Sequence, residues 1–302
     1  MLKKINLKKT ILVFIVVVVL FFLYLLYSVY NFYNIVYEPL ETKEVTEETD
    51  KASRSDQSIK NILLLGIDND GESYKGGRPD VIMLARLNRD NNNIGIVSIP
   101  RDTRVELPGR GYDKINHAYA YEGSGYLVQT LEGFLDIDIH NYAKINFDGF
   151  VNIVDAIGGV EMDIEQDMYY YDDALDEVIV DLEEGKQALD GEEALGFVRW
   201  RGTPDADIGR IQRQQKFLQN MLDQTISFGN IIKSRQISNK FANNIKTNFQ
   251  LADTLLLSWS AFRADWNEVS TKTLEGEGVR IDGIWYYNVD QERARGTIDE
   301  VI

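Results

Sequence analysis

The stretch Asn-Ile-Leu-Leu-Leu-Gly-Ile-Asp, residues 61–68, decides the fold, because a short apolar run ends here at a glycine and an aspartate. Two more runs of the same kind follow it, Val81–Leu87 and Ile94–Ile99, with polar residues between them. Short apolar runs that are rich in branched residues and bounded by polar loops are typical of buried β-strands. We therefore predict three central strands in the first part of a sheet.

Beyond these strands, the sequence alternates between patterns typical of helices and patterns typical of strands. Apolar residues at helical spacing predict a helix from Gly125, and residues 165–188 are acidic and without period, which predicts an irregular surface excursion. The remaining expected strands are Tyr142–Phe147, Val160–Ile164, Thr271–Leu274 and Trp285–Asn288, and the remaining expected helices are Gly149–Ala156, Gly191–Val198, Ile208–Ser227 and a pair between Ile231 and Ala264. Strands interleaved with helices predict an α/β domain, a central mixed sheet with helices on both faces.

The N-terminus predicts a membrane anchor. Residues 11–30 form an almost purely apolar run, which is long enough for a helix to cross a bilayer. Four lysines precede the run and no acidic residue occurs before Glu38, so the N-terminus is expected in the cytoplasm and the rest of the chain outside. A cleaved signal peptide is the alternative, but the run is long for one and no small-residue cleavage site follows. We predict a cytoplasmic tail (1–10), a transmembrane helix (11–33), an extracellular linker (34–58) and one catalytic domain (59–302), as in a Gram-positive-type envelope.

Composition narrows the classes of function. The chain has 302 residues, a net charge of −16, two histidines and no cysteine. Cysteine-based metal or redox chemistry is excluded, and a histidine-rich metal site is not expected. Because the four N-terminal lysines are the only charges in the first 33 residues, residues 34–302 carry −20. A domain this acidic is not expected to bind nucleic acid, and an anionic substrate would need a local concentration of arginine.

Charged residues gather where the first strands begin or end. Asp68 ends the first strand, Arg78 and Asp80 precede the second, and Arg101 and Asp102 follow the third. Ligands of open α/β sheets bind beyond the strand ends, so these side chains are expected to converge. Carboxylates suit Mg²⁺ when phosphate oxygens complete its shell, and guanidinium groups bind phosphate bidentately. The pattern predicts an anion-and-metal site.

A second cluster of arginines lies later in the chain. Arg199 and Arg201 are two residues apart, which places both side chains on one side of an extended segment. Arg210, Arg213 and Gln214 have helical i, i+3 and i+4 spacing near a predicted helix start, which places them on one face. Free N–H groups at a helix start also favour anions. The cluster predicts further phosphate contacts.

Each of these residues also has a purely structural reading when it is taken alone. Asp68 fits a turn cap, Asp80 fits an ion pair with Arg78, and Arg101 fits an ion pair with Asp102. The arginine-rich helix face fits a solvated surface. It is their recurrence at successive strand ends that favours a binding site.

In this order, the residues resemble the LytR-CpsA-Psr family of membrane-anchored cell-wall enzymes. The similar segments are Asn-Ile-Leu-Leu-Leu-Gly-Ile-Asp (61–68), Arg-Pro-Asp-Val-Ile-Met-Leu (78–84), Ser-Ile-Pro-Arg-Asp-Thr (98–103), Lys-Ile-Asn-His-Ala-Tyr (114–119), Ile-Gly-Gly-Val (157–160), Leu-Asp-Gly-Glu-Glu-Ala-Leu (189–195) and the arginine-rich stretch 199–215. They extend over most of the predicted ectodomain.

The resemblance implies a phosphotransferase that moves a glycopolymer, such as wall teichoic acid or capsule, from an undecaprenyl pyrophosphate carrier onto peptidoglycan. It implies Mg²⁺ (or Mn²⁺) on the aspartates at positions 68 and 80. It also implies phosphate contacts from the arginines at 78, 101, 199, 201 and 210 and from Gln214. A lipid pyrophosphate hydrolase and a non-catalytic envelope regulator remain the alternatives.

Two features of the predicted site stay open from the sequence. An acceptor hydroxyl would benefit from a base, and Asp68 and Asp102 are both candidates. The prenyl tail needs an apolar groove between the sheet and the helices, and we expect four phenylalanines to line it, at positions 134, 147, 150 and 217.

Overall fold

The computed structural model describes residues 27–40, 58–68, 77–173, 176–202, 206–227, 243–250, 253 and 269–302. Its centre is a six-stranded mixed sheet in the order β11-β6-β1-β2-β3-β12. These strands are β1 (Ile59–Asp68), β2 (Arg78–Asn88), β3 (Ile94–Ser98), β6 (Asn141–Asn146), β11 (Ile245–Thr247) and β12 (Ser270–Thr273). The three predicted central strands are confirmed as neighbours β1, β2 and β3.

The alternation of side chains along β1 explains why this sheet has helices on both faces. Leu63, Leu65 and Ile67 are almost completely buried on one face, whereas Leu64 and Gly66 point to the other. Both faces are apolar, and a strand of this kind must be covered on both sides. β1 pairs antiparallel with β2 and parallel with β6. The predicted α/β domain with a mixed central sheet is therefore confirmed.

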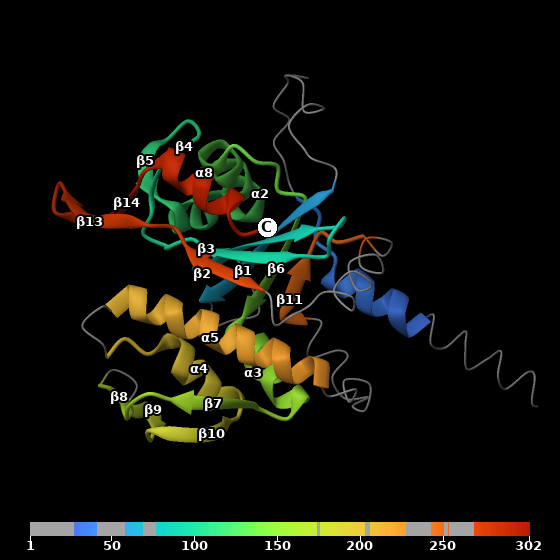
Figure 1. Ribbon diagram of the computed structural model, residues 1–302, viewed down its shortest axis with the longest axis vertical. Coiled ribbons are helices and arrows are strands. Elements are labelled where there is room, and N and C mark those ends of the chain that lie inside the picture. Colours follow the sequence, from blue (N-terminus) through green and yellow to red (C-terminus); the bar gives the residue numbers. More distant parts are fainter. Residues whose placement is uncertain are drawn as a thin grey trace, which may run out of the picture.

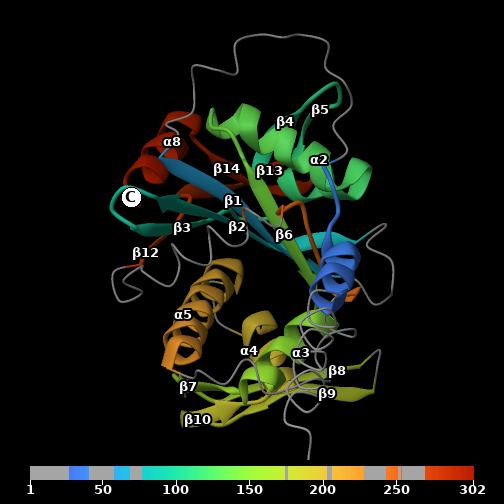
Figure 2. The same cartoon turned by 90° about the vertical axis from the view of Figure 1, so that its right-hand side faces the viewer.

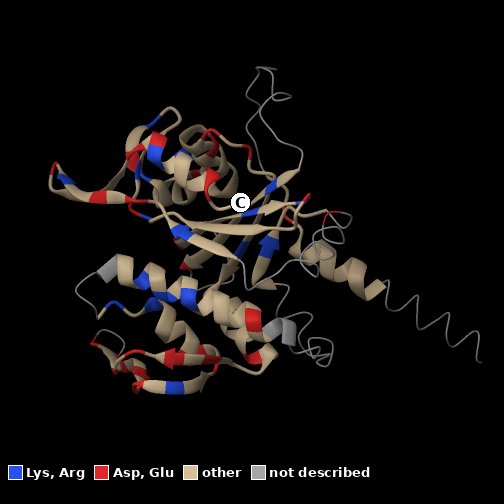
Figure 3. Cartoon of the chain, in the orientation of Figure 1, with Lys and Arg blue, Asp and Glu red and all other residues tan. Residues whose placement is uncertain are grey.

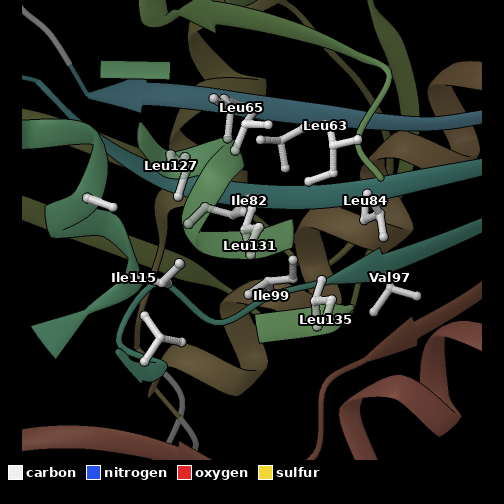
Figure 4. Close-up of a cluster of buried hydrophobic side chains, with 14 of the residues drawn as sticks. Leu63, Leu65, Ile82, Leu84, Val97, Ile99, Ile115, Leu127, Leu131 and Leu135 are labelled. Carbon is white, nitrogen blue, oxygen red and sulfur yellow. The ribbon is translucent and has the colours of Figure 1, made fainter. Parts of the chain in front are cut away.

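One face of the sheet is covered by α2 (Ile115–Leu135) and α8 (Gln291–Asp299). Figure 4 shows Leu127, Leu131 and Leu135 of α2 packed against the leucines and isoleucines of the first three strands. The sequence predicted this helix only from Gly125. It begins ten residues earlier and has a break at Glu122 and Gly123, where Gly123 has a φ of 76°.

The other face carries α3 (Phe147–Ile157), α4 (Gly191–Arg199) and α5 (Ala206–Ser227). Figure 2 shows these three helices between the sheet and an outer layer of short strands. Their buried side chains form a second apolar cluster with that layer, centred on Phe197, Trp200 and Phe217. The expected helices over these stretches are confirmed to within a few residues.

The outer layer corrects the expectation for residues 165–188. Instead of an irregular excursion, the chain forms paired ribbons of β7 (Val160–Ile164) with β10 (Gly185–Leu189) and of β8 (Met168–Asp172) with β9 (Glu177–Leu182). In β9, Val180 and Leu182 are buried while their neighbours are more exposed. Acidic residues and tyrosines at the exposed positions hid this period of two from the sequence.

Two hairpins complete the fold, β4 (Arg104–Leu107) with β5 (Gly111–Lys114) and β13 (Gly276–Ile281) with β14 (Ile284–Val289). Only β14 was expected from the sequence. The turn of the second hairpin has positive φ at both Asp282 and Gly283, which is the usual chemistry of a two-residue hairpin loop. Figure 1 shows this hairpin extending from the sheet at the side where α5 begins.

The segment before residue 41 is attached to the edge of the sheet. Residues 27–36 are helical, Tyr37 forms a parallel bridge with Thr247 of β11, and the Glu38 N–H donates to the Thr247 carbonyl at 2.7 Å. Most of the predicted anchor (11–26), most of the linker and most of the predicted helix pair at 231–264 lie outside the described residues. Within the described part of the chain, no helix combines the length and apolarity that a bilayer crossing requires.

Candidate active site

A pocket of about 840 Å³ lies between the sheet and α3, α4 and α5. Leu64, Gly66, Val81 and Met83 contribute the sheet side. The helix side is apolar, with residues from all three helices: Phe147, Phe150, Ile153, Leu195, Val198, Phe217, Leu218 and Met221. The part of the pocket that runs back along the strands can therefore hold an extended apolar group.

The strand ends supply the charged end of this pocket. Asp68 closes β1 opposite Arg78 in the antiparallel register, which brings Asp80 to the same edge. A shift of register between Gly66 and Ile67 adjusts this last part of the pairing. Asp68, Asp80 and Arg101 all line the pocket, and Arg101 donates to the Asp80 carboxylate through Nη1. The predicted convergence of these three side chains is found in the structure.

The segment after α4 supplies two more arginines. A capping box between Asp190 and Glu193 fixes the start of α4, and Trp200 ends it in an extended conformation. Trp200 is buried, so Arg199 and Arg201 on either side of it turn outward and both line the pocket. Figure 3 shows basic residues at this segment and along α5, whereas the β7–β10 layer is mainly acidic. The arginines are thus concentrated at the pocket of an acidic chain.

Helix α5 divides its predicted residues between two tasks. Arg210 is 3% exposed and lines the pocket together with Gln214, whose Nε2 donates to the Val198 carbonyl at 3.2 Å. Arg213 does not line it: its Nη2 donates to the Trp200 carbonyl at 2.6 Å and its guanidinium lies over the Trp200 ring. Burial lowers the pKa of Arg213. Arg213 therefore holds the connection between α4 and α5 in place.

Arg78 of β2 was also predicted to contact phosphate. Its side chain is exposed, and it is not among the residues that line the pocket.

Asp102 lies on a second, smaller pocket of about 240 Å³. This pocket shares Arg101 and Arg210 with the large one, and Ile208, Trp285 and Tyr286 also line it. The Asp102 Oδ1 atom lies 2.7 Å from Lys114 Nζ, and its Oδ2 atom lies 3.9 Å from Arg101 Nε. Asp102 therefore shares the small pocket with two of the arginines that also line the large one.

The expected apolar groove exists, with one correction to its residues. Phe147, Phe150 and Phe217 line the large pocket, and the rings of Phe150 and Phe217 are 5.3 Å apart. Phe134 instead packs on the opposite face of the sheet with the α2 core. A single sequence has no pattern that separates these phenylalanines, because all four occur in apolar helical or strand-end contexts.

The sequence missed several residues that line the two pockets. Tyr169 and Tyr170 of β8 reach the large pocket from the segment expected to be irregular, and Trp285 and Tyr286 reach the small one. Tyr169 and Tyr170 belong to a stretch that was expected to be irregular, whereas Trp285 and Tyr286 belong to an expected strand that no sequence feature linked to the site.

Asp68 and Asp80 offer a metal two carboxylates at the strand ends, and Asp172 of β8 also lines the pocket. Among the described residues, no group of three or more His, Asp or Glu side chains is arranged to hold a metal ion. Asp68 and Asp80 line the pocket together beside the arginines. Mg²⁺ is commonly held by one or two carboxylates plus substrate phosphates, so this donor set fits Mg²⁺ only when an anionic ligand is also bound.

The family model and the similar proteins of known name point to the same family. The family model described as LytR_cpsA_psr family matches residues 24–301. A relative from Oceanobacillus iheyensis, named polyisoprenyl-teichoic acid–peptidoglycan teichoic acid transferase TagU, is 36% identical over 251 residues, which are 80% of this chain and 74% of the relative.

Solved structures agree with the fold. The crystal structure of B. subtilis TagV has a TM-score of 0.67 and 30% identity, covering 82% of this chain and 98% of its own. A structure of the LytR-CPS2A-psr family protein YwtF (TagT), with bound octaprenyl pyrophosphate lipid, has a TM-score of 0.59 and 28% identity, covering 85% of this chain and 92% of its own.

Proposed function

Because the chain belongs to the LytR-CpsA-Psr family, we propose that it transfers a glycopolymer from a polyisoprenyl pyrophosphate carrier to peptidoglycan. One observation carries this proposal: a single pocket joins an apolar channel to a cluster of arginines and aspartates. A ligand that is apolar at one end and doubly phosphorylated at the other matches both parts. The name of the TagU relative and the lipid bound in the YwtF (TagT) structure support the same substrate class.

In this proposal the prenyl chain lies along the apolar part of the pocket, between the sheet and Phe147, Phe150 and Phe217. Burial of an apolar chain there is favourable at about 25 cal/mol per Å² of apolar surface. The pyrophosphate then lies at the strand ends, where Arg101, Arg199, Arg201 and Arg210 line the same pocket. Guanidinium groups bind phosphate oxygens bidentately, which fixes both position and orientation.

The chemistry follows from this placement. An acceptor hydroxyl attacks the phosphorus that carries the glycopolymer, and the lipid monophosphate leaves. Phosphoryl transfer depends mainly on positioning and on stabilisation of negative charge, which the arginines supply without a covalent intermediate. The hydrogen bond from Gln214 to the Val198 carbonyl fixes the orientation of the Gln214 side-chain amide, which lines the pocket.

We also propose that Asp68 and Asp80 hold Mg²⁺ (or Mn²⁺) when the pyrophosphate is bound. When bound, the ion would neutralise charge on the phosphate oxygens. Arg101 already pairs with Asp80, so the arginine and the ion would share this carboxylate. EDTA should abolish polymer attachment, and added Mg²⁺ should restore it. Attachment that persists in EDTA would contradict this part of the proposal.

We further propose that residues 11–33 anchor the chain in the cytoplasmic membrane, with the catalytic domain outside. The apolar run and the lysines before it support this placement. Protease added to intact protoplasts should degrade the domain, and degradation only after lysis would contradict the proposed topology.

The experiment for the transfer uses the full chain in lipid nanodiscs, a polyprenyl pyrophosphate-linked sugar polymer and peptidoglycan glycan strands. We expect polymer covalently attached to the glycan and release of lipid monophosphate. Free polymer without attachment would identify a hydrolase instead. Arg101→Ala should abolish attachment, whereas Arg104→Ala, which removes an arginine stacked on Tyr112 away from both pockets, should retain it. Unchanged attachment by Arg101→Ala would refute the site.

A further inference from the structure

The small pocket beside Asp102 has no role in the function described so far. It lies between the start of α5 and the β13–β14 hairpin, which Figure 1 shows on the same side of the molecule. Its volume is about 240 Å³, and Arg101 and Arg210 line both this pocket and the large one. A second pocket that shares two of the arginines proposed to bind phosphate is placed to hold a second substrate.

We propose that this pocket is the subsite for the acceptor sugar, with Trp285 as its stacking platform and Asp102 as its proton acceptor. The proposal rests on the transferase function proposed above. It adds the place from which the acceptor enters, and it selects Asp102 over Asp68 as the base, because only Asp102 lines this pocket.

The direction of the reaction supports this location. In phosphoryl transfer the attacking and leaving oxygens lie roughly in line with the phosphorus. If the leaving lipid phosphate points into the apolar pocket, the acceptor must approach the phosphorus from the direction opposite to it. The small pocket borders the large one at Arg101 and Arg210, which line both, so an acceptor held there would lie next to the proposed pyrophosphate position.

The lining of the pocket suits a sugar ring. Trp285 is 61% exposed although it is a large aromatic residue, and Ile208 across the pocket is 46% exposed. An exposed indole beside charged groups offers its flat apolar face to the C–H face of a pyranose while polar groups bind the hydroxyls. Gly278 leaves space at the same place, because a Cβ there would meet no atom within 4 Å.

The platform is fixed relative to the reacting groups. The Tyr287 N–H donates to the Asp102 carbonyl at 2.8 Å, and Thr103 forms a bridge with Tyr287. The Tyr287 hydroxyl accepts from the Gly276 N–H at 2.9 Å. The hairpin is thus hydrogen-bonded directly to the Arg101–Thr103 loop, which fixes the position of Trp285 relative to Asp102.

Asp102 is held in a suitable position for the proton. Lys114 binds one carboxylate oxygen, and the other oxygen faces Arg101. In the proposed step the acceptor oxygen forms the new bond to phosphorus and the bond to the bridging pyrophosphate oxygen breaks. The lipid monophosphate leaves with that electron pair, and the acceptor proton passes to Asp102. A loose transition state requires little basicity, because the proton is transferred late.

The test measures attachment kinetics of the full chain while donor and acceptor concentrations are varied separately. Trp285→Ala should raise the KM for glycan strands about tenfold, equivalent to 1.4 kcal/mol, and leave the donor KM within about twofold. Gly278→Val, which adds a side chain at a pocket position where a Cβ meets no atom within 4 Å, should have the same effect. Ile284→Ala is the matched control, because Ile284 is 50% exposed on the same strand but does not line the pocket.

Asp102→Asn should lower kcat for attachment about 100-fold, which is within the usual range for a general base. Its donor KM should stay near that of the wild type. Asp68→Asn tests the alternative base and should change the Mg²⁺ dependence instead.

The outcomes separate this inference from the proposed function. If the wild type attaches polymer but Trp285→Ala and Gly278→Val leave the acceptor KM unchanged, the subsite is wrong and the transferase function stands. A rise in donor KM alone would assign the pocket to the donor polymer and would overturn the inference. If the wild type attaches nothing, the proposed function itself fails.

Discussion

At the scale of single residues, the buried Lys144 depends on a residue far from it in the sequence. Its Nζ atom lies 2.6 Å from Glu38 Oε1, and the hydroxyl groups of Tyr119 and Ser124 are 3.3 and 3.4 Å away. The Tyr142 hydroxyl donates to the same Glu38 carboxylate at 3.0 Å. Burial lowers the pKa of Lys144, and Glu38 counteracts this shift. Glu38 is therefore the main compensation for a buried charge.

Glu38→Gln should destabilise the fold by about 1–3 kcal/mol, because it leaves that charge under-compensated. Between the lowered pKa of folded Lys144 and its ordinary value of 10.5, the unfolded chain binds more protons, so stability rises with pH in that window. Removing Glu38 lowers the pKa further and widens the window. Urea unfolding at pH 7 to 10 measures this, with Lys144→Met as the matched background. An equal cost of Glu38→Gln in both backgrounds would show that the pair is not coupled.

His140 predicts a second pH dependence, at acidic pH. Its Nδ1 atom accepts from the Asn61 N–H at 3.2 Å, and burial lowers its pKa, as do Lys60 and Arg89, while Asp138 acts in the opposite direction. The unfolded chain binds the proton first, so this stability is complete above pH 6.5 and is lost as the pH falls below it. The stability of His140→Gln should fall less between pH 7 and 5 than that of the wild type, by at most about 1.4 kcal/mol per pH unit. Urea unfolding at pH 5 to 7 measures both proteins, and an equal loss of unfolding free energy in the two would contradict this.

At the scale of elements, the contact between α3 and α4 positions the arginine segment. Gly191 begins α4, and its N–H donates to Asp155 Oδ1 of α3 at 2.8 Å. A Cβ at Gly191 would lie 2.5 Å from the Val151 carbonyl oxygen, so the two helices touch through a glycine. Any displacement of α4 here also displaces Arg199 at its other end.

Gly191→Ala should destabilise the domain by about 1–3 kcal/mol, because the helices must separate to admit the methyl group. Gly133→Ala is the matched control: a Cβ there meets nothing within 4 Å, and the change should stabilise α2 by about 0.5–1 kcal/mol. Thermal unfolding measures both changes. A stabilised Gly191→Ala protein would show that the α3–α4 contact is looser than described.

The elements also show how far the sequence could predict the fold and the site. β1, β2 and β3 were predictable because each is dominated by a short run of apolar residues, and α3 and α4 because their apolar residues have a clear helical period. β8 and β9 were missed because β8 is almost entirely tyrosine and aspartate, and because acidic residues interrupt the apolar residues of β9. Helical spacing placed Arg210, Arg213 and Gln214 on one face. It did not show that Arg213 would donate to the Trp200 carbonyl instead of lining the pocket. Which face of the sheet a phenylalanine covers depends on topology, so Phe134 and Phe147 were not distinguishable.

At the scale of the whole molecule, the large pocket separates two apolar clusters. The sheet with α2 and α8 forms one, and α3, α4 and α5 with the outer strands form the other. The pocket lies where the two layers face each other. A ligand that fills it contacts both layers and should stabilise them together.

Octaprenyl pyrophosphate at 100 times its Kd should stabilise the folded state by about 2.7 kcal/mol. For a domain of this size, this corresponds to a rise in Tm of several degrees. Inorganic pyrophosphate contacts only the charged end, so its effect at equal concentration should be much smaller. Differential scanning calorimetry of the full chain in detergent compares them. Equal shifts would show that the prenyl chain does not enter the pocket.

The bridge between Tyr37 and Thr247 has a consequence for handling the protein. β11 is the outermost strand of the sheet, and the backbone of residues 37 and 38 occupies its free side. A fragment cut after residue 40 would lose both this cover and Glu38, and would expose unpaired strand backbone next to an uncompensated lysine. Such bare edges recruit strands from other molecules and cause aggregation. We therefore expect such a fragment to aggregate more readily than the chain that retains residues 37–40.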